Sequence, residues 1–357
     1  MKKLLLAICV SAALMMTAMT VDAGEMLTPY YPGGTIGSAP GILPPPGFYF
    51  STFMAFGPDW RSYDTNGHPV PGVKLDVWEV SPALTWVPGC KFLGADYAMA
   101  VSQSVVHWDS RYGFGKVDGL GVALTGAQTG TGNTVLVPYV LGWHLPCNFH
   151  ATTGLVIALD DGSNSAKDSE AAVNKIGPDR FFGKFSSVPA SGLGSFFVYD
   201  ANGYTSIVPN VGISWLYHGW NISGSFKYAF ATKDDTINYQ TGDLFDADFT
   251  VTYTWGKWSF GGGIGESQQV TNDEYQTTSN PASYGVHPDA APNPDDHVGF
   301  KFHELWGGPC IAYNFGPVYM KLVYLFNFDT RNAGGGDSVL FTIVVPLGNP
   351  FGTGKSK

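Results

Sequence analysis

The residues of this sequence best suited to binding a ligand directly are a His-Cys-His triplet. His144, Cys147 and His150 follow one another at intervals of three. Their imidazole and thiol groups suit soft metal ions. Three ligands on one turn rarely close a metal site, however, so we expect no bound metal.

Catalytic motifs are missing from the sequence. It contains neither a G-x-S-x-G nucleophile elbow nor a G-x-x-x-x-G-K-[ST] phosphate loop. His107 and Ser110 could form part of a surface hydrolase site, but no third group stands ready to orient them. We therefore predict that the chain is not an enzyme and needs no cofactor. The formal net charge of −10 also argues against nucleic acid as a partner.

Charged and hydroxyl side chains recur at every second position in several stretches. In DADFTVTYTW (residues 246–255) the apolar set begins at Ala247 and alternates with Asp and Thr. Period-two alternation places the two sets on opposite faces of a strand. We expect the apolar face to meet lipid and the polar face to line a wet interior. The candidate interior residues are Glu79, Lys227, Asp246, Asp248, Thr250 and Lys321.

Two interpretations of the interior charges remain open. Lys227 and Asp248 are expected on neighbouring strands, near each other on the interior face. They could form a buried pair that braces the wall, or they could select the solute that passes. Both interpretations fit a charge held inside a barrel, where it interacts more strongly than in bulk water.

Composition favours many strands over helices. Charged residues make up 13% of the chain, against about 25% in an average globular protein. Beyond the N-terminus no apolar run approaches the length of a membrane-spanning helix, so a membrane protein of this kind must be a closed barrel. We predict an all-β fold, an antiparallel transmembrane β-barrel of twelve strands. The predicted strands are 47–57, 75–87, 93–107, 134–144, 150–160, 205–217, 221–233, 244–255, 258–270, 299–313, 317–328 and 338–348.

Connections between these strands alternate in length. Those after every second strand are short, whereas the others include the long stretches 161–204 and 271–298. Short periplasmic turns and long extracellular loops are typical of outer-membrane barrels. Tryptophans cluster beside the short turns and are predicted to form an interfacial aromatic girdle: Trp86, Trp143, Trp215, Trp255 and Trp258. Cys90 and Cys147 fall in consecutive short turns, and an exported chain permits a disulfide between them.

The chain divides into four parts. Residues 1–23 read as a signal peptide, with Lys2 and Lys3 before an apolar run and cleavage near Ala23. Residues 24–46 are rich in Pro and Gly and are expected to stay periplasmic or to plug the barrel. The barrel is predicted over 47–348, with a tail at 349–357. Localisation in the outer membrane of a Gram-negative bacterium follows from these assignments.

Several motifs resemble one family of bacterial outer-membrane proteins. They are LPPPGFYF (43–50), VPGVKLDVWEVSPALTWV (70–87), VPYVLGWHLPCNFH (137–150) and SVLFTIVVPL (338–347). The chain resembles the SphA-like, "meta-pathway of phenol degradation" family, which is related in concept to FadL-type transporters. The resemblance implies a channel for passive uptake of small hydrophobic or aromatic compounds, in contact with outer-membrane lipid and lipopolysaccharide. The alternative is a structural or surface-interaction barrel that transports nothing.

Overall fold

The structure is a computed structural model, and its described residues form one antiparallel barrel. It describes residues 33–63, 66–69, 73–117, 120–163, 203–233, 239–272, 274–275 and 301–349. The predicted signal peptide with its cleavage site, most of the long loops and nearly all of the C-terminal tail lie outside these ranges. No helix within them is long and apolar enough to cross a membrane.

Twelve strands make the wall of the barrel, as predicted. They are β1 (Gly47–Ser62), β2 (Val73–Val87), β4 (Ala95–Val117), β5 (Leu120–His144), β6 (Phe149–Ala158), β7 (Ser206–Tyr217), β8 (Trp220–Ala231), β10 (Leu244–Trp255), β11 (Trp258–Gln269), β13 (His303–Asn314), β14 (Tyr319–Arg331) and β16 (Ser338–Gly348). Four strands of two residues each accompany them: β3 (Lys91–Phe92), β9 (Tyr239–Gln240), β12 (Glu274–Tyr275) and β15 (Gly334–Gly335).

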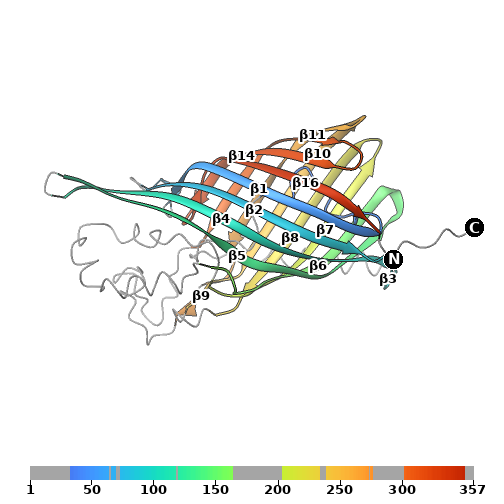
Figure 1. The fold of residues 1–357 in the computed structure, drawn as a ribbon, viewed down its shortest axis with the longest axis horizontal. Coiled ribbons are helices and arrows are strands. Elements are labelled where there is room, and N and C mark those ends of the chain that lie inside the picture. The colour runs from blue at the N-terminus through green and yellow to red at the C-terminus, as the bar shows by residue number, and fades with distance from the viewer. Residues whose placement is uncertain are drawn as a thin grey trace, which may run out of the picture.

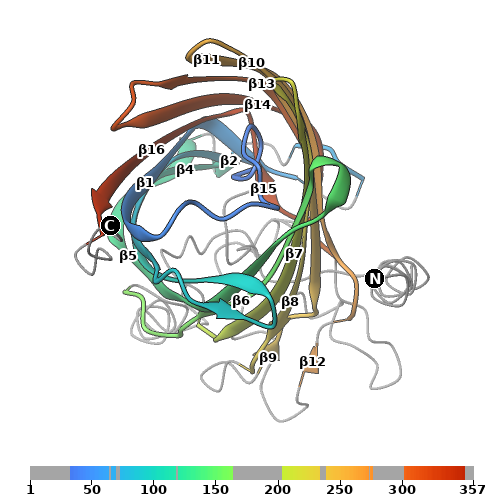
Figure 2. The ribbon, with the colours of Figure 1, turned by 90° about the vertical axis from the view of Figure 1, so that its right-hand side faces the viewer.

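The barrel closes through its first strand. Wall strands that follow one another in the chain pair side by side, and β1 pairs with both β2 and β16. Figures 1 and 2 show the resulting cylinder from the side and along its axis. Closure leaves no free edge around the middle of the wall, so its backbone groups are paired without help from water.

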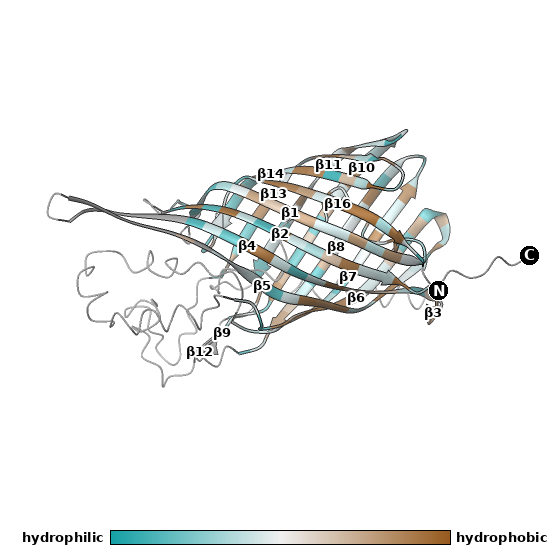
Figure 3. Cartoon of the chain, in the orientation of Figure 1, coloured by the Kyte–Doolittle hydropathy of each residue, from teal (hydrophilic) through white to brown (hydrophobic). Residues whose placement is uncertain are grey.

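Residues alternate between the two faces of the wall, as the sequence pattern predicts. In β10, Phe249 and Val251 are 49% and 46% exposed, whereas Asp246 and Asp248 are 1% and 2% exposed. Polar and apolar residues also alternate along most other strands (Figure 3). The exposed apolar face points outward, and the buried polar face points into the barrel.

The five connections predicted to be short, after β2, β5, β7, β10 and β13, lie at one end of the barrel, together with the start of β1 and the end of β16 (Figure 1). The turn between β7 and β8 consists of His218 and Gly219, both with positive φ. A type I′ hairpin turn requires positive φ at both central positions. The predicted alternation of short and long connections fails between β4 and β5, which are separated at the other end only by residues 118–119.

One predicted loop is instead part of a hairpin. We expected strands over 93–107 and 134–144, but β4 and β5 pair from Asp96↔Gly142 out to Val117↔Leu120. The two strands extend well beyond their neighbours (Figure 1). The stretch 119–133 is rich in Gly and Thr, so it lacks the apolar contrast that marks the other strands.

A bulge lies beside β13, but on its partner β14. Leu305 pairs with Asp329 and Trp306 with Asn327, so the extra residue is Phe328 of β14. A bulge adds one residue to one side of a ladder and changes which residues face inward. β13 itself keeps one inward parity, with Glu304, Trp306, Cys310 and Ala312 all buried, and it pairs with β11 without a shift.

We predict that arginine destabilises the barrel at one position of β10 and is tolerated at another. Val251→Arg places a charge on the lipid face near mid-strand and should destabilise the folded barrel by about 2–4 kcal/mol. Thr254→Arg has the same charge on the inner face near the short turns, and it should be tolerated. The measurement is urea unfolding in lipid vesicles, with the heat-modified band on unboiled gels as the folding readout. Equal losses for both variants would contradict the assignment of faces.

Candidate functional site

Residues 33–46, here called the inner segment, run inside the barrel (Figure 2). They contact strands on different sides of the wall. Thr152 of β6 donates a hydrogen bond to the carbonyl of Pro40 at 2.7 Å, and Lys321 of β14 donates one to the carbonyl of Ile36 at 2.7 Å. The inner segment belongs to no strand, so side chains of the wall supply partners for its backbone.

Strands β7, β8 and β10 hold the middle of the inner segment. The N–H of Gly41 donates to Ser214 Oγ at 2.9 Å. Asn221 Nδ2 donates to the carbonyl of Ser38 at 3.0 Å. The N–H of Gly37 donates to Thr250 Oγ1 at 2.8 Å. Thr250, a predicted interior residue, is thus a partner of the inner segment.

Lys321 anchors the start of the inner segment. Its Nζ donates to the carbonyls of Gly34 at 3.2 Å and Ile36 at 2.7 Å, and to Ser38 Oγ at 2.8 Å. An ammonium group has three donors, and here all of them bond to the inner segment. The lysine is 3% exposed. These bonds compensate part of the cost of burying its charge.

Glycines on the inner face make room for the inner segment. A Cβ on Gly263 of β11 would lie 2.9 Å from Ile36 Cγ1, and one on Gly212 of β7 would lie 2.5 Å from the carbonyl oxygen of Pro40. Carbon atoms cannot approach that closely, so any larger residue would displace the segment or the strand. The backbone of the wall therefore meets the inner segment directly at these two places.

A compact charge cluster lies on the inner face of β8 and β10. Lys227 Nζ is 2.8 Å from Asp246 Oδ2 and 3.6 Å from Asp248 Oδ2. Thr35 of the inner segment donates from Oγ1 to Asp248 Oδ2 at 2.5 Å. The structure thus brings together the two residues expected to be neighbours, Lys227 and Asp248, and adds Asp246 as the closer partner. It also connects the cluster to the inner segment.

Acidic groups outnumber lysines in this part of the wall. Asp246 pairs in register with Ser267 of β11, and Ser267 pairs with Glu304 of β13. Glu304 is 7% exposed and Ser267 is fully buried. Among the described residues, Asp246 Oδ1, Asp248 Oδ1 and Ser267 Oγ have no hydrogen-bond partner. Buried polar atoms are costly when unpaired, so this region retains acceptor capacity that the folded wall itself does not use.

The remaining predicted interior residue is separate from the cluster. Glu79 lies on the inner face of β2, and four strands separate β2 from β8 along the wall. Ser81 donates a hydrogen bond to its carboxylate. The structure therefore places five of the six candidates against the inner segment or the charge cluster, and Glu79 apart from both.

The predicted girdle tryptophans all lie close to short turns. Trp255 and Trp258 flank the β10–β11 turn as a register pair, 75% and 42% exposed. Trp86 stacks on Phe48 with ring centroids 5.6 Å apart. Trp143 donates from Nε1 to the carbonyl of Leu93 in the neighbouring turn. Trp215 lies near the end of β7.

The possible disulfide between Cys90 and Cys147 is not formed in the structure, where both residues are free, exposed thiols. Cys147 lies in the 3₁₀ turn η1 (Pro146–Asn148) with φ 61°. Cys90 precedes β3, which folds back onto β4. A disulfide requires Cα atoms within about 7 Å and Cβ atoms directed at each other. Neighbouring turns alone do not supply that geometry.

The His-Cys-His triplet does not converge on one point. The Nδ1 atoms of His144 and His150 are 2.7 Å apart, while the other ring nitrogen of His144 is 3.5 Å from Asp96 Oδ2. Within the described ranges, no group of three or more His, Cys, Asp or Glu side chains is arranged to hold a metal ion.

Sequence reasoning missed several residues of the site. Thr35, Ile36 and Ser38 lie before the first strand, where no periodicity indicates a direction. Glu304 and Trp306 share the inward parity of Cys310 and Ala312, but Gly307, Gly308 and Pro309 interrupt the alternation that would indicate it. A detectable signal was the run Gly261-Gly262-Gly263 in β11, because glycine inside a strand indicates close approach of another backbone.

Comparison with known proteins gives a family and a fold. None of the curated proteins matches this sequence. The crystal structure of the COG4313 outer membrane channel from Pseudomonas putida F1 is similar, with a TM-score of 0.55 at 10% identity, covering 87% of this chain and 98% of that one. A Pseudomonas aeruginosa FadL homologue gives a TM-score of 0.36 at 9% identity, covering 90% and 99%. The likeness to the Pseudomonas putida channel establishes the fold, which is that of Gram-negative outer-membrane barrels.

The family match covers most of the wall. The family described as "Putative MetA-pathway of phenol degradation" matches residues 61–175 and 193–343. These ranges include ten of the twelve wall strands in full, from β2 to β14, and most of β16. The chain therefore belongs to this family.

Proposed function

We propose that this protein is an outer-membrane channel for the passive uptake of small hydrophobic or aromatic compounds. In this proposal the chain catalyses no reaction. It is exported by a cleaved signal peptide, and it sits among outer-membrane lipid and lipopolysaccharide with its short turns in the periplasm. Trp86, Trp143, Trp215, Trp255 and Trp258 would mark the periplasmic interface.

The observation that carries the proposal is the way in which the inner segment is held. Side chains of the wall make its bonds, some to its backbone, as at Lys321, Thr152 and Asn221, and others to its side chains, as between Thr35 and Asp248. None of them is part of a strand ladder, so the segment can shift while the barrel stays closed. A segment bound in this way suits a plug that yields to solute.

The family and the similar structure support the same function. The solved structure is titled an outer membrane channel, and the family description concerns phenol degradation. A channel in such a family would take up aromatic compounds for degradation inside the cell. The rival function is a structural or surface-interaction barrel, in which the inner segment stays in place permanently.

A disulfide lock separates these two functions. A Cβ on Gly37 would lie 2.9 Å from Cys310 Sγ and 3.2 Å from Cys310 Cβ. The Cβ atoms of a disulfide are about 3.5–4.5 Å apart, so the bond requires a small shift at Gly37, whose φ of 75° also strains an L side chain. We predict that Gly37→Cys, in a Cys90→Ser/Cys147→Ser background, bonds to Cys310 on oxidation. Swelling of liposomes in catechol and planar-bilayer conductance should then fall to the level of protein-free membranes, and reductant should restore both.

The same double-serine background with Gly37 retained is the matched control, and its flux should not respond to oxidation. If the unlocked protein conducts no ions and passes no catechol, transport is wrong and the structural barrel stands. If flux persists with the lock closed, a plug at this position is wrong.

The charge cluster is proposed to brace the wall behind the inner segment. Lys227→Met leaves Asp246 and Asp248 buried without their counter-charge, which should destabilise the barrel by about 3–5 kcal/mol. Removing the acids as well, in Lys227→Met/Asp246→Asn/Asp248→Asn, should recover part of that loss. Lys74→Met is the control, because its ion pair with Asp59 is solvent-exposed. Urea unfolding in vesicles measures all three, and an unchanged midpoint for Lys227→Met would favour a role in solute selection alone.

A further inference from the structure

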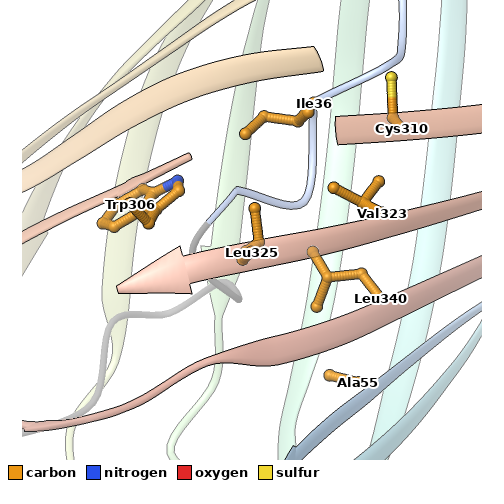
Figure 4. Close-up of a cluster of buried hydrophobic side chains, with 7 residues drawn as sticks. All are labelled: Ile36, Ala55, Trp306, Cys310, Val323, Leu325 and Leu340. Atoms are coloured by element: carbon orange, nitrogen blue, oxygen red, sulfur yellow. The ribbon is translucent and has the colours of Figure 1, made fainter. Parts of the chain in front are cut away.

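Ile36 occupies the main apolar site on the inner wall near the charge cluster. It is fully buried and clusters with Trp306 and Cys310 of β13 and with Val323 and Leu325 of β14. Figure 4 shows its side chain between Trp306 and Cys310, beside the two aliphatic residues of β14. Gly263 of β11 completes the site, because only a hydrogen fits opposite the Ile36 methyl groups.

Polar groups bind the same short stretch of chain from both sides. Lys321 Nζ donates to the carbonyl of Ile36 at 2.7 Å. Asp248 Oδ2 accepts from the hydroxyl of Thr35 at 2.5 Å. Thr35 and Ile36 therefore present three features together: a branched hydrocarbon, a hydroxyl donor and an oxygen acceptor. Asp248 accepts from the hydroxyl, Lys321 donates to the carbonyl, and the apolar cluster packs around the hydrocarbon.

The polar groups beside the apolar site, here called the polar rim, are Lys321, Asp248 and the indole N–H of Trp306. They can make hydrogen bonds beyond the two just described. Among described residues, Trp306 Nε1 and Asp248 Oδ1 are buried without a hydrogen-bond partner. Both atoms lie within 2.6 Å of the position that a Cβ would take on Gly265. An additional donor and an additional acceptor therefore lie near the same point, beside Gly265.

We propose that this site, lined by Gly263, Trp306, Cys310, Val323 and Leu325, binds the transported solute, and that Thr35 and Ile36 occupy it as an internal substitute. The proposal rests on the transport function proposed above and specifies its substrate class. The solute is a single-ring aromatic that carries a hydroxyl group. Its ring takes the place of the Ile36 side chain, and its hydroxyl accepts from Lys321 and donates to Asp248.

The chemistry of the rim favours a hydroxyl over other substituents. When Thr35 leaves, Asp248 loses a donor, and when Ile36 leaves, Lys321 loses an acceptor. A hydroxyl supplies both functions. A carboxylate would satisfy Lys321 but would be repelled by Asp248, and a pure hydrocarbon would leave both groups unpaired.

The test weakens the internal substitute and measures binding directly. Ile36→Ala removes most of the apolar contact while keeping the backbone and Thr35. Isothermal titration of the full-length protein in detergent should show phenol binding tighter than wild type by on the order of tenfold. The matched control is Ile222→Ala, an isoleucine on the lipid face of β8 that is 47% exposed. Its affinity for phenol should equal that of wild type.

Toluene, which has a ring but no hydroxyl group, separates the contribution of the polar rim to binding from that of the apolar residues. In Ile36→Ala, the gain for phenol should exceed the gain for toluene by about threefold or more, because only phenol pairs with Lys321 and Asp248. Equal increases in affinity for phenol and toluene would show that the site does not recognise a hydroxyl group. A phenol affinity in Ile36→Ala no different from wild type would overturn the site itself.

The binding result and the transport result are independent. If catechol flux is present and responds to the Gly37→Cys lock while Ile36→Ala leaves phenol affinity unchanged, the channel stands and this site is wrong. If Ile36→Ala binds phenol tightly but no variant passes solute, the site stands as a binding site and transport is wrong.

Discussion

The structure depends on one requirement: every buried peptide group inside the barrel must be hydrogen-bonded. The wall meets it through its own ladders, because β1 pairs on both sides and closes the sheet. The inner segment cannot do so, since it joins no strand. Its own turns satisfy the N–H groups of Ile36, Ser38 and Ile42. Wall side chains supply partners for other peptide groups: Lys321, Thr152, Ser214, Asn221 and Thr250. The positions of polar residues on the inner face follow from this requirement.

Alternation in the sequence predicted the faces of the wall well. In a strand with one apolar and one polar face, polarity alternates from each residue to the next, and DADFTVTYTW alternates without interruption. The same signal predicted that Asp246, Asp248 and Lys321 face inward, because a polar residue in an apolar strand has only one acceptable direction in a membrane. Strand number and the order of turns followed from the same pattern.

The contacts made by the inner segment were beyond sequence reasoning. Which residues of 33–46 meet which strands depends on the diameter and stagger of the closed barrel, and no local pattern records them. The length of the β4–β5 hairpin was missed because Gly and Thr give little contrast between faces. Glu304 and Trp306 were missed because Gly307, Gly308 and Pro309 interrupt the alternation of polar and apolar residues along β13.

The position of the inner segment has a consequence for the order of assembly. Thr152 and Lys321 contact the segment from β6 and β14, so its complete set of bonds requires both halves of the sheet. The seam between β1 and β16 joins the two ends of the barrel sequence, and contacts of such long separation carry the greatest loop-closure entropy. The inner segment immediately precedes β1, so its bonds to β14 hold β1 close to the C-terminal strands with which it must pair. Binding of the inner segment and formation of the seam therefore favour each other during assembly.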